Sequence, residues 1–486
     1  MKFNSIEFLL YFPLVALSYF LLPQRHRWLL LLAASYYFYM CWEPVYALLI
    51  VASTVVDYAA GRLMGASADR AQRRKYLFVS MALNLGLLFT FKYLDFTLAS
   101  LKAAFAPFNL LEDLPLFHLV LPVGISFYTF QTLSYTIDVY RGTAPAERHL
   151  GYFALYVVYF PQLVAGPIER TDRLLPQLRA THAFDLQRIY SGALCMLWGF
   201  FKKLAIADPL GLIVDPVYNN PQAFEGPAFV VATVAFAIQI YCDFSGYSDI
   251  AIGASRILGI ELMQNFRRPY LARSLVEFWQ RWHISLSQWF RDYVYVPLGG
   301  NRGSTARVCV NLFIVFLVSG LWHGASWTFV AWGALHGTYL IVGRLTRAPR
   351  AALAAALRLE RVPRLHLAAQ IATTFTLVLA AWVFFRAASV ADACYIFASL
   401  GTGWQSFTVS VLEPFANVGV PLDQLVAALI AILCLELVQL AQEYTRLSAW
   451  FFQRPVALRW GAYQLLLLGV FLLGDFHERA FIYFQF

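Results

Sequence analysis

The sequence is poor in charged residues and lacks the short motifs of nucleotide chemistry. Only 13% of its 486 residues are Asp, Glu, Lys or Arg, whereas 60% are hydrophobic. Soluble domains carry about 25% charged residues, so this composition excludes a soluble protein. Neither a G-x-x-x-x-G-K-[ST] loop nor a G-x-G-x-x-G segment after a strand is present, which leaves nucleotide-driven transport without support.

Cysteine is also scarce, and its spacing carries no chemistry. None of the six cysteines belongs to a C-x-x-C pair, the spacing that is typical of thiolate metal sites and redox motifs. We interpret all six as small buried hydrophobic residues and expect no metal site. They are scattered through apolar runs, at Cys41, Cys195, Cys242, Cys309, Cys394 and Cys434.

Long apolar runs recur along almost the whole chain. Because a membrane-spanning helix needs about 20 residues, the runs predict an all-α, polytopic integral membrane protein with about eleven transmembrane or re-entrant helices in contact with membrane lipid. The first run resembles a signal peptide, but Glu7 precedes it and no small-x-small site follows, so we interpret it as a retained helix. Further spans are predicted around residues 28–40, 46–61, 76–92, 117–137, 190–214, 228–258, 308–343, 366–386, 422–440 and 460–475.

The net charge of +9 is concentrated in a few short loops. Short loops rich in Lys and Arg stay on the cytoplasmic side of a membrane, so residues 25–27, 62–75 and 344–364 are predicted to be cytoplasmic. The loop around Glu43 carries no basic residue, which predicts an N-terminus on the outside. Membrane topology thus accounts for the positive charge, and we expect no nucleic-acid partner.

One histidine lies inside a predicted span. The stretch SGLWHGASWTFVAWGALHG, residues 319–337, contains His323 beside Trp322 and Gly324. Both flanks of residues 308–343 are basic, so this segment is predicted to enter and return on the cytoplasmic side, with His323 near its deepest point, well inside the membrane. Two interpretations stay open: a hydrogen-bonded core histidine, or a functional group facing a cavity. A neutral, buried imidazole would serve as a general base toward a hydroxyl.

An aromatic and basic block, SLVEFWQRWHISLSQWFRDYVYVPLGGNRG, precedes this segment. One continuous helix through it would be amphipathic and would lie flat at the membrane interface. His283 would lie on the apolar margin of that helix, where packing and donor binding are equally consistent with the pattern. The polar stripe would comprise Arg281, Ser285, Gln288 and Asp292, and the apolar stripe Phe278, Trp282 and Trp289.

A third group of polar residues interrupts the span predicted at 228–258. Polar side chains facing hydrocarbon are costly, so we expect this group to line a water-accessible cavity. Its members are Asp243, Ser245, Tyr247, Ser248 and Asp249.

Together these motifs resemble the membrane-bound O-acyltransferase (MBOAT) family. The resemblance rests first on FWQRWHISLSQWFRDYVYVPLGGNRG followed by GLWHGASWTFVAWGALHG. Within the family, the AlgI-like branch of bacterial alginate O-acetyltransferases is the more similar, and the proteins of teichoic-acid D-alanylation are more distant. The finer likeness is carried by SFYTFQTLSYTIDVYRG, YFPQLVAGPI, YCDFSGYSDIAIG, NFRRPY and the closing FIYFQF. The resemblance to the family is strong over about residues 120–340 and weak over residues 345–475.

The resemblance implies one membrane domain over residues 1–486, with a catalytic core at about 120–340 and a ring of helices around a central tunnel. It places the two family histidines at His283 and His323, of which His323 takes the catalytic position. The implied reaction moves an acyl group from a cytoplasmic thioester such as acetyl-CoA through a bacterial inner membrane. A periplasmic acetyltransferase would then modify an exopolysaccharide such as alginate or cellulose. Residues expected to bind substrate or line the tunnel are Trp279, Arg281, Trp282, Trp322, Asp243, Ser245, Tyr247 and Asp249.

His336 is predicted to lie outside this site. On a straight helix from residue 325, its 13-residue separation from His323 amounts to about 20 Å, so we assign it a structural or tunnel-mouth role. Other functions stay open: D-alanyl or other acyl transfer by the same fold, a scaffold without catalysis, or a secondary transporter or proton channel in which Asp243, Asp249 and His323 form a relay. The transporter has less support because the sequence shows no internal repeat.

Overall fold

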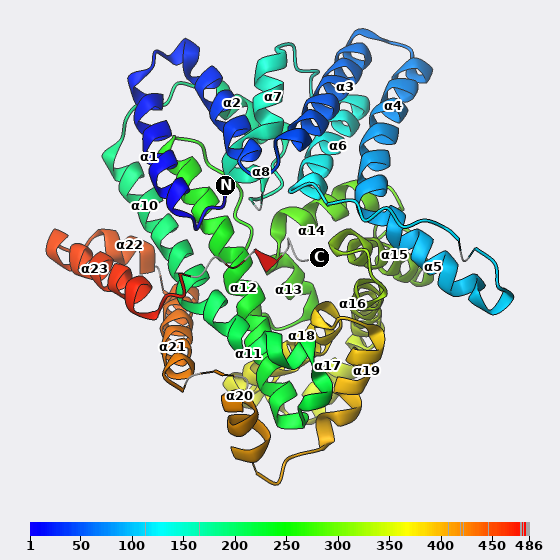
Figure 1. Ribbon diagram of the computed structural model, residues 1–486, viewed down its shortest axis with the longest axis vertical. Coiled ribbons are helices and arrows are strands. Elements are labelled where there is room, and N and C mark those ends of the chain that lie inside the picture. Colours follow the sequence, from blue (N-terminus) through cyan, green and yellow to red (C-terminus); the bar gives the residue numbers. More distant parts are fainter. Residues whose placement is uncertain are drawn as a thin grey trace. The chain divides into compact units, whose positions relative to one another are not determined.

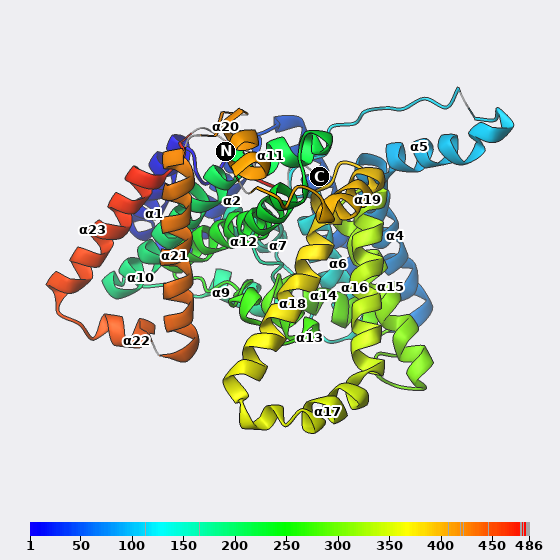
Figure 2. The same ribbon diagram turned by 90° about the horizontal axis from the view of Figure 1, so that it is seen from below.

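The computed structural model describes residues 1–111, 113–164, 166–406, 408–417, 419–420, 422–445, 447–476, 479 and 481–482. The regular elements of these residues are helices (Figures 1 and 2). Seven helical runs among them are long and apolar enough to cross a membrane. The prediction of an all-α, multi-pass membrane protein is confirmed, whereas the count of eleven spans stays a prediction. The seven runs are Pro44–Ala66, Arg70–Phe108, Gly226–Ile257, Thr305–His323, Pro363–Arg386, Leu422–Tyr444 and Val456–Leu473.

The helices group into two compact units. The first unit comprises Met1–Met196 with Ile250–Gln264, and the second comprises Leu197–Asp249 with Asn265–Phe486. Each unit contains membrane-length helices, so the division does not test the expectation of one membrane domain over the whole chain.

In the first unit, α3, α4 and α6 pack against one another in pairs and lie side by side in Figure 1. Helix α4 begins where the sequence supplies a cap, because the side chain of Asp69 accepts hydrogen bonds from the backbone N–H groups of Ala71 and Gln72. The helices of this part of the chain are α1 (Ile6–Leu21), α2 (Gln24–Met40), α3 (Ala47–Ala66), α4 (Arg70–Leu88), α5 (Leu94–Phe105), α6 (Ile125–Arg141), α7 (Leu150–Val158), α8 (Phe160–Leu163), α9 (Thr171–Arg179) and α10 (Leu186–Phe200).

In the second unit, α15 and α16 share the most extensive packing of any helix pair among the described residues, and α18 packs on α16 (Figure 2). The helices from here on are α11 (Asp208–Asn219), α12 (Gly226–Ile257, whose last turns belong to the first unit), α13 (Leu275–Arg281), α14 (Ile284–Phe290), α15 (Thr305–His323), α16 (Trp327–Leu345), α17 (Arg347–Ala356), α18 (Pro363–Arg386), α19 (Val390–Ala398), α20 (Glu413–Asn417), α21 (Leu422–Tyr444), α22 (Leu447–Phe452) and α23 (Val456–Leu473).

The span predicted at 190–214 is interrupted by a π-helical turn. Helix α10 ends at Phe200, residues Phe201–Ala207 form the π-helix, and α11 follows. The side chains of the π-helix are buried, including those of Lys202 and Lys203. An irregular turn that buries two lysines is costly unless their charges are compensated.

Candidate functional site

The segment around His323 is a helical hairpin, as both basic flanks predicted. Helix α15 ends at His323, residues 324–326 turn, and α16 returns antiparallel. Glycines allow the close approach: a Cβ on Gly320 would lie 2.3 Å from the carbonyl oxygen of Phe329, and one on Gly333 would lie 2.4 Å from that of Phe316. The hairpin therefore fixes His323 at its tip.

The imidazole of His323 is 4% exposed and is surrounded by aromatic rings. Its ring centroid lies 5.0 Å from Trp322, 4.9 Å from Trp332 and 5.5 Å from Phe385, the last of these on α18. Each interplanar angle is 70° or more, so the neighbouring rings contact the imidazole edge to face. These contacts enclose the imidazole of His323 in a largely aromatic environment.

The depth of His323 in the membrane is not fixed by the hairpin alone. Helix α15 has 19 residues, which rise about 28 Å and match the hydrocarbon thickness of about 30 Å. Phe385, which contacts His323, is the penultimate residue of the 24-residue helix α18. The expectation that His323 lies well inside the membrane therefore stays a prediction.

The block before the hairpin is not one continuous helix, so that prediction was wrong. Helix α13 ends at Arg281, α14 starts at Ile284, and His283 between them has a left-handed φ of +42°. Backbone bonds to a preceding segment replace the helical ones: Ile284 N donates to Asn265 O at 2.9 Å, and Arg267 N donates to Arg281 O at 2.9 Å. The expected polar stripe is also absent, because Arg281 and Ser285 are buried.

The break directs His283 into the interior, where its side chain is fully buried. The rings of Phe244 and Trp322 lie 4.7 Å and 6.0 Å away. Burial lowers the pKa of His283 from 6.5 to about 3. The imidazole is therefore neutral at physiological pH.

The tautomer of His283 follows from its partner Asn265. The backbone N–H of Ser285 donates to Asn265 Oδ1 at 3.3 Å, so that atom must be the carbonyl oxygen rather than the amide nitrogen. His283 Nδ1 lies 3.1 Å from the same oxygen and must carry the proton. This arrangement places the basic lone pair of His283 on Nε2.

Trp322 joins the two histidines, since it contacts both His283 and His323. The predicted tryptophans lie in the same aromatic environment: Trp282 is 5.1 Å from Trp382, and Trp279 is 5.7 Å from Trp332. The structure thus brings together side chains from α13, α15, α16 and α18. We call His283, Trp322, His323, Trp332 and His336 the histidine cluster.

His336 belongs to this cluster, and the prediction that it lies about 20 Å from His323 was wrong. The centroids of His323 and His336 lie 4.9 Å and 4.8 Å from that of Trp332. The two imidazoles therefore cannot be further apart than the sum of these two distances. Side chains on a helix lean toward its N-terminus, and in the antiparallel hairpin this leaning brings His323 and His336 toward each other.

The charge of Arg281, predicted to bind substrate, is balanced by carboxylates. Its Nη2 lies 2.6 Å from Glu277 Oε1 and 2.9 Å from Glu443 Oε1, and Arg268 pairs with the other oxygen of Glu443 at 2.5 Å. These ion pairs connect α13 to α21. Arg281 thereby positions α13, the helix that carries Trp279.

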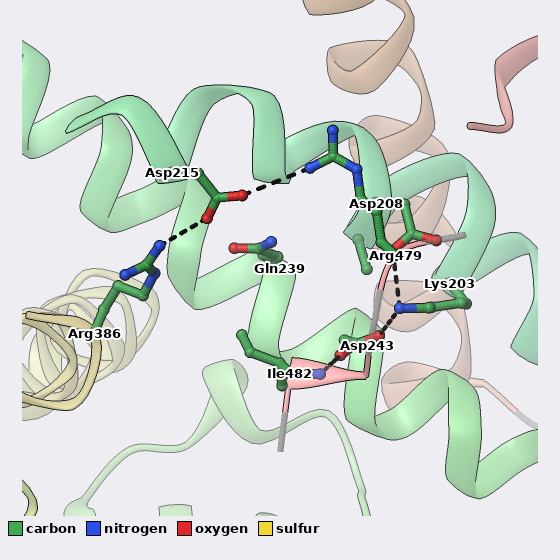
Figure 3. Close-up of a pocket in the computed structure, with 9 residues that line it drawn as sticks. Lys203, Asp208, Asp215, Gln239, Asp243, Arg386, Arg479 and Ile482 are labelled. Carbon is green, nitrogen blue, oxygen red and sulfur yellow. Dashed lines mark hydrogen bonds and ion pairs between the residues drawn. The ribbon is translucent and has the colours of Figure 1, made fainter. Parts of the chain in front are cut away.

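The polar residues predicted on α12 separate into two groups. Asp243 lines a cavity of about 130 Å³ (Figure 3), as expected, but Ser245, Tyr247 and Asp249 are not among the lining residues of that cavity. Ser245 and Asp249 instead hold Lys202 Nζ, at 2.8 Å and 2.6 Å. The ring of Tyr247 packs on that of Phe481 at a tilt of 37°, with centroids 4.4 Å apart.

Lys203 is a functional candidate that the sequence analysis missed. Its Nζ lies 2.8 Å from Asp208 and 2.5 Å from Asp243, and on the opposite wall of the cavity Arg386 pairs with Asp215 at 2.7 Å (Figure 3). The sequence did contain a clue to this site, because Lys202 and Lys203 lie inside the span predicted at 190–214. A lysine buried in a membrane span requires a carboxylate nearby. Ala207, Gln239, Arg479 and Ile482 complete the lining.

The cavity adjoins the histidine cluster through α18. Consecutive residues of this helix serve the two places: Phe385 contacts His323, and Arg386 lines the cavity. Among the residues that the structure describes, no group of three or more His, Cys, Asp or Glu side chains could hold a metal ion.

Comparison with known proteins decides the family. Residues 144–385, which include all three histidines of the cluster, match the model of the MBOAT, membrane-bound O-acyltransferase family. The chain is 42% identical to the "Probable alginate O-acetylase AlgI" of Azotobacter vinelandii over 403 residues, which cover 82% of this chain and 78% of that protein. The chain belongs to the membrane-bound O-acyltransferase family. This O-acyltransferase is therefore an integral membrane enzyme.

Other relatives differ in the group they transfer or the polymer they modify. The chain is 34% identical to the "Peptidoglycan O-acetyltransferase" of Helicobacter pylori, with 80% of this chain and 78% of that protein covered. It is 27% identical to the "Teichoic acid D-alanyltransferase" of Bacillus subtilis, with 46% of this chain and 60% of that protein covered. The relatives that match over most of this O-acyltransferase are thus named for acetyl transfer.

Proposed function

We propose that this O-acyltransferase moves an acetyl group from acetyl-CoA, or another cytoplasmic acyl thioester, to a hydroxyl on the outer side of a bacterial inner membrane. The acetyl group would serve O-acetylation of an exopolysaccharide such as alginate or cellulose. The names of the relatives that cover most of the chain support both the group and the polymer class. The single observation that carries the mechanism is the convergence of His283 and His323 on Trp322.

In the proposed reaction His323 acts as general base. Its neutral imidazole accepts the proton of the acceptor hydroxyl while the hydroxyl oxygen attacks the thioester carbonyl carbon. A carbon–oxygen bond forms, the carbon–sulfur bond breaks, and the proton passes from the imidazolium to the departing thiolate. The products are an ester and a free thiol, and no proton is consumed.

His283 has a different part in this proposal. With its proton on Nδ1 and held by Asn265, its Nε2 is suited to accept a hydrogen bond. It therefore cannot stabilise negative charge on the carbonyl oxygen in this tautomer. We propose that Nε2 accepts a hydrogen bond from an N–H or O–H of a bound substrate and so positions the reacting group.

The two substrates would approach from opposite sides. The basic residues at 344–364 follow α16 and would attract an anionic thioester on the cytoplasmic side. The charged cavity beside Arg386 would admit the acceptor from the outside, where the N-terminus is also predicted to lie. A separate periplasmic or membrane-anchored acetyltransferase would accept the acetyl group and bind the polysaccharide.

Reconstitution tests this proposal. Proteoliposomes with radiolabelled acetyl-CoA inside would be mixed with polymer, with or without the acetyltransferase encoded nearby in the genome. We expect labelled polymer only when the partner is present. Efficient labelling without a partner would contradict the relay, and absence of labelling with acetyl-CoA but transfer from a D-alanyl thioester would contradict the acetyl assignment.

A further inference from the structure

Helix α17 (Arg347–Ala356) is almost unpacked within the described part of the chain. None of its ten residues is buried, and its main contacts are with the adjoining α16 and the short turn Leu359–Arg361. A helix of this length is marginal on its own in water. Most of its surface is therefore open to a stabilising neighbour outside the chain.

The position of α17 is set by the two helices that it joins. Helix α16 ends at Leu345, α18 begins at Pro363, and the two pack against each other. Helix α18 is one of the membrane-length runs, so its first turn lies where the chain enters the hydrocarbon. Figure 2 shows α17 crossing between the ends of α16 and α18 rather than continuing either of them. A helix in this place lies along the membrane surface.

This connection carries a strong positive charge. Residues 344–364 contain six arginines and a single acidic residue, Glu360. All six arginines are exposed, and none of them forms an ion pair with a carboxylate that the structure describes. The six arginines, which we call the basic surface, are Arg344, Arg347, Arg350, Arg358, Arg361 and Arg364. A negatively charged neighbour would complement this surface.

Apolar side chains lie next to these arginines. Leu353 and Leu357 are one turn apart at the end of α17 and are 59% and 60% exposed. Arg350 lies three residues before Leu353 and so on the same side of the helix. Beyond α17, Leu365 in the first turn of α18 is 66% exposed. The neighbour must therefore offer an apolar environment as well as negative charge.

This combination decides between the possible neighbours. A soluble anion would pair with the arginines and leave the leucines in water. Anionic phospholipids offer phosphates, which accept bidentate hydrogen bonds from guanidinium groups, and an acyl boundary that leucines can enter. The long stem of an arginine can lie on apolar surface while its charged end stays at the phosphates. The place of α17 at the end of a membrane-length helix favours lipid over a protein partner as well.

We propose that α17 lies flat on the membrane and that the basic surface binds the headgroups of anionic phospholipids. Leu353 and Leu357 enter the boundary between headgroups and acyl chains, and the arginines pair with the phosphates. The lipid thereby supplies the packing that α17 lacks among the described residues. This interaction goes beyond the proposed function and depends on neither the acyl donor nor the acceptor.

The lipid selectivity of the full-length protein tests this proposal. Native mass spectrometry of protein taken from micelles with equal amounts of phosphatidylglycerol and phosphatidylcholine would count the retained lipids of each kind. We expect the wild type to retain phosphatidylglycerol preferentially. The double substitution Arg347→Gln/Arg350→Gln should weaken this preference about fivefold for each arginine removed, the effect of one basic residue at an anionic membrane surface. Arg347→Lys/Arg350→Lys keeps the charge and should keep most of the preference.

A matched control removes the same charge elsewhere. Arg62→Gln/Arg70→Gln changes two exposed arginines in another segment that is predicted to be cytoplasmic, and its lipid preference should equal that of the wild type. Hydrogen–deuterium exchange gives a second readout. The amides of residues 347–356 should exchange more slowly in nanodiscs of phosphatidylglycerol than in nanodiscs of phosphatidylcholine. Leu353→Ser/Leu357→Ser should remove this protection.

Each of the following results would overturn the proposal. An unchanged phosphatidylglycerol preference in Arg347→Gln/Arg350→Gln, or an equal loss in the control, would show that the basic surface is not the lipid site. Equal exchange of wild-type α17 in the two kinds of nanodisc would show that anionic lipid does not stabilise this helix. Loss of the lipid preference on addition of coenzyme A would assign the basic surface to soluble phosphate compounds instead.

Discussion

Two buried polar clusters, one in each compact unit, are built in opposite ways. In the first unit the fully buried carboxylate of Asp57 accepts hydrogen bonds from Ser80 Oγ at 2.6 Å and from Asn84 Nδ2 at 2.9 Å and 3.0 Å. Ser53 Oγ lies 3.2 Å from its other oxygen. These four residues, which we call the Asp57 cluster, come from the packed helices α3 and α4.

The histidine cluster of the second unit has the reverse character. Asp57 makes no ion pair among the described residues, yet its oxygens are paired by neutral donors. In contrast, the ring nitrogens of His336 and Trp332 are buried among aromatic rings and have no hydrogen-bond partner within the described part of the chain. Within the Asp57 cluster, both carboxylate oxygens are hydrogen-bonded to neighbouring side chains, which suits a role in holding α3 and α4 together. The histidine cluster instead buries imidazoles among aromatic rings, which suits the catalytic role proposed for His323.

The largest expected effect that separates the two clusters is on transfer. His323→Ala removes the proposed base, and we expect transfer of acetyl to fall at least 100-fold, within the range typical of general base catalysis. Mass spectrometry of the polymer from expressing cells would measure it, with membrane insertion checked by immunoblotting. His366→Ala, which removes an imidazole that pairs with Gln370 of the same helix, α18, should retain activity. A near-normal acetyl content in His323→Ala would contradict the base assignment.

An intermediate effect is expected on stability alone. Asp57→Leu removes the carboxylate that accepts from Ser80 Oγ and Asn84 Nδ2 and leaves them Thr136 Oγ1 and the Ser80 carbonyl oxygen as acceptors, so we expect a loss of about 1–3 kcal/mol in total. Thermal unfolding in detergent should show a lower Tm, and the KM for acetyl-CoA of the folded protein should stay unchanged. Asp57→Asn keeps an acceptor oxygen and should lose less stability. A raised KM in Asp57→Leu with a normal Tm would show that the Asp57 cluster also serves substrate binding.

The smallest expected effect is a pH dependence of stability from His283. Its pKa is lowered by burial from 6.5 to about 3, so an unfolded chain takes up a proton at pH values where the folded chain does not. Its contribution is fully present above pH 6.5 and decreases as the pH falls toward 3, by about 1.4 kcal/mol per pH unit. Unfolding of wild type and His283→Asn between pH 7 and pH 5 would measure this difference. Parallel curves for the two proteins would contradict the assignment of a neutral, buried imidazole.

The hairpin was predictable because charge placement constrains topology independently of local structure. Arg307 before it and Arg344 after it could lie on one side of a membrane only if the chain turned back between them. The helical structure of the apolar runs could also be predicted from the sequence, since a single segment in lipid can hydrogen-bond all of its own backbone groups only as a helix. The proximity of His283 and His323 came from family resemblance, because no pattern in the sequence relates residues 40 positions apart.

The failures of prediction have physical causes in tertiary structure. The residues around His283 have an uninterrupted helical period, and the break is imposed by backbone pairing with Asn265 and Arg267, which no local pattern reveals. The distance of His336 from His323 was overestimated because it was counted along one axis, whereas the large ring of Trp332 bridges the two side chains. The pairing of Lys203 with Asp243 likewise joins residues of separate helices.

The aromatic rings around His323 bear on hydrolysis, the side reaction to which the proposed thioester donor would be exposed. A thioester held beside a base is susceptible to hydrolysis, which would waste the donor whenever no acceptor is present. Trp332 and Phe385, which contact His323, are 0% and 1% exposed, and rings packed this closely leave little room for a nucleophilic water. With the thioester donor proposed above, this packing would protect the bound thioester from water, so that the timing of transfer would depend on the arrival of the acceptor hydroxyl.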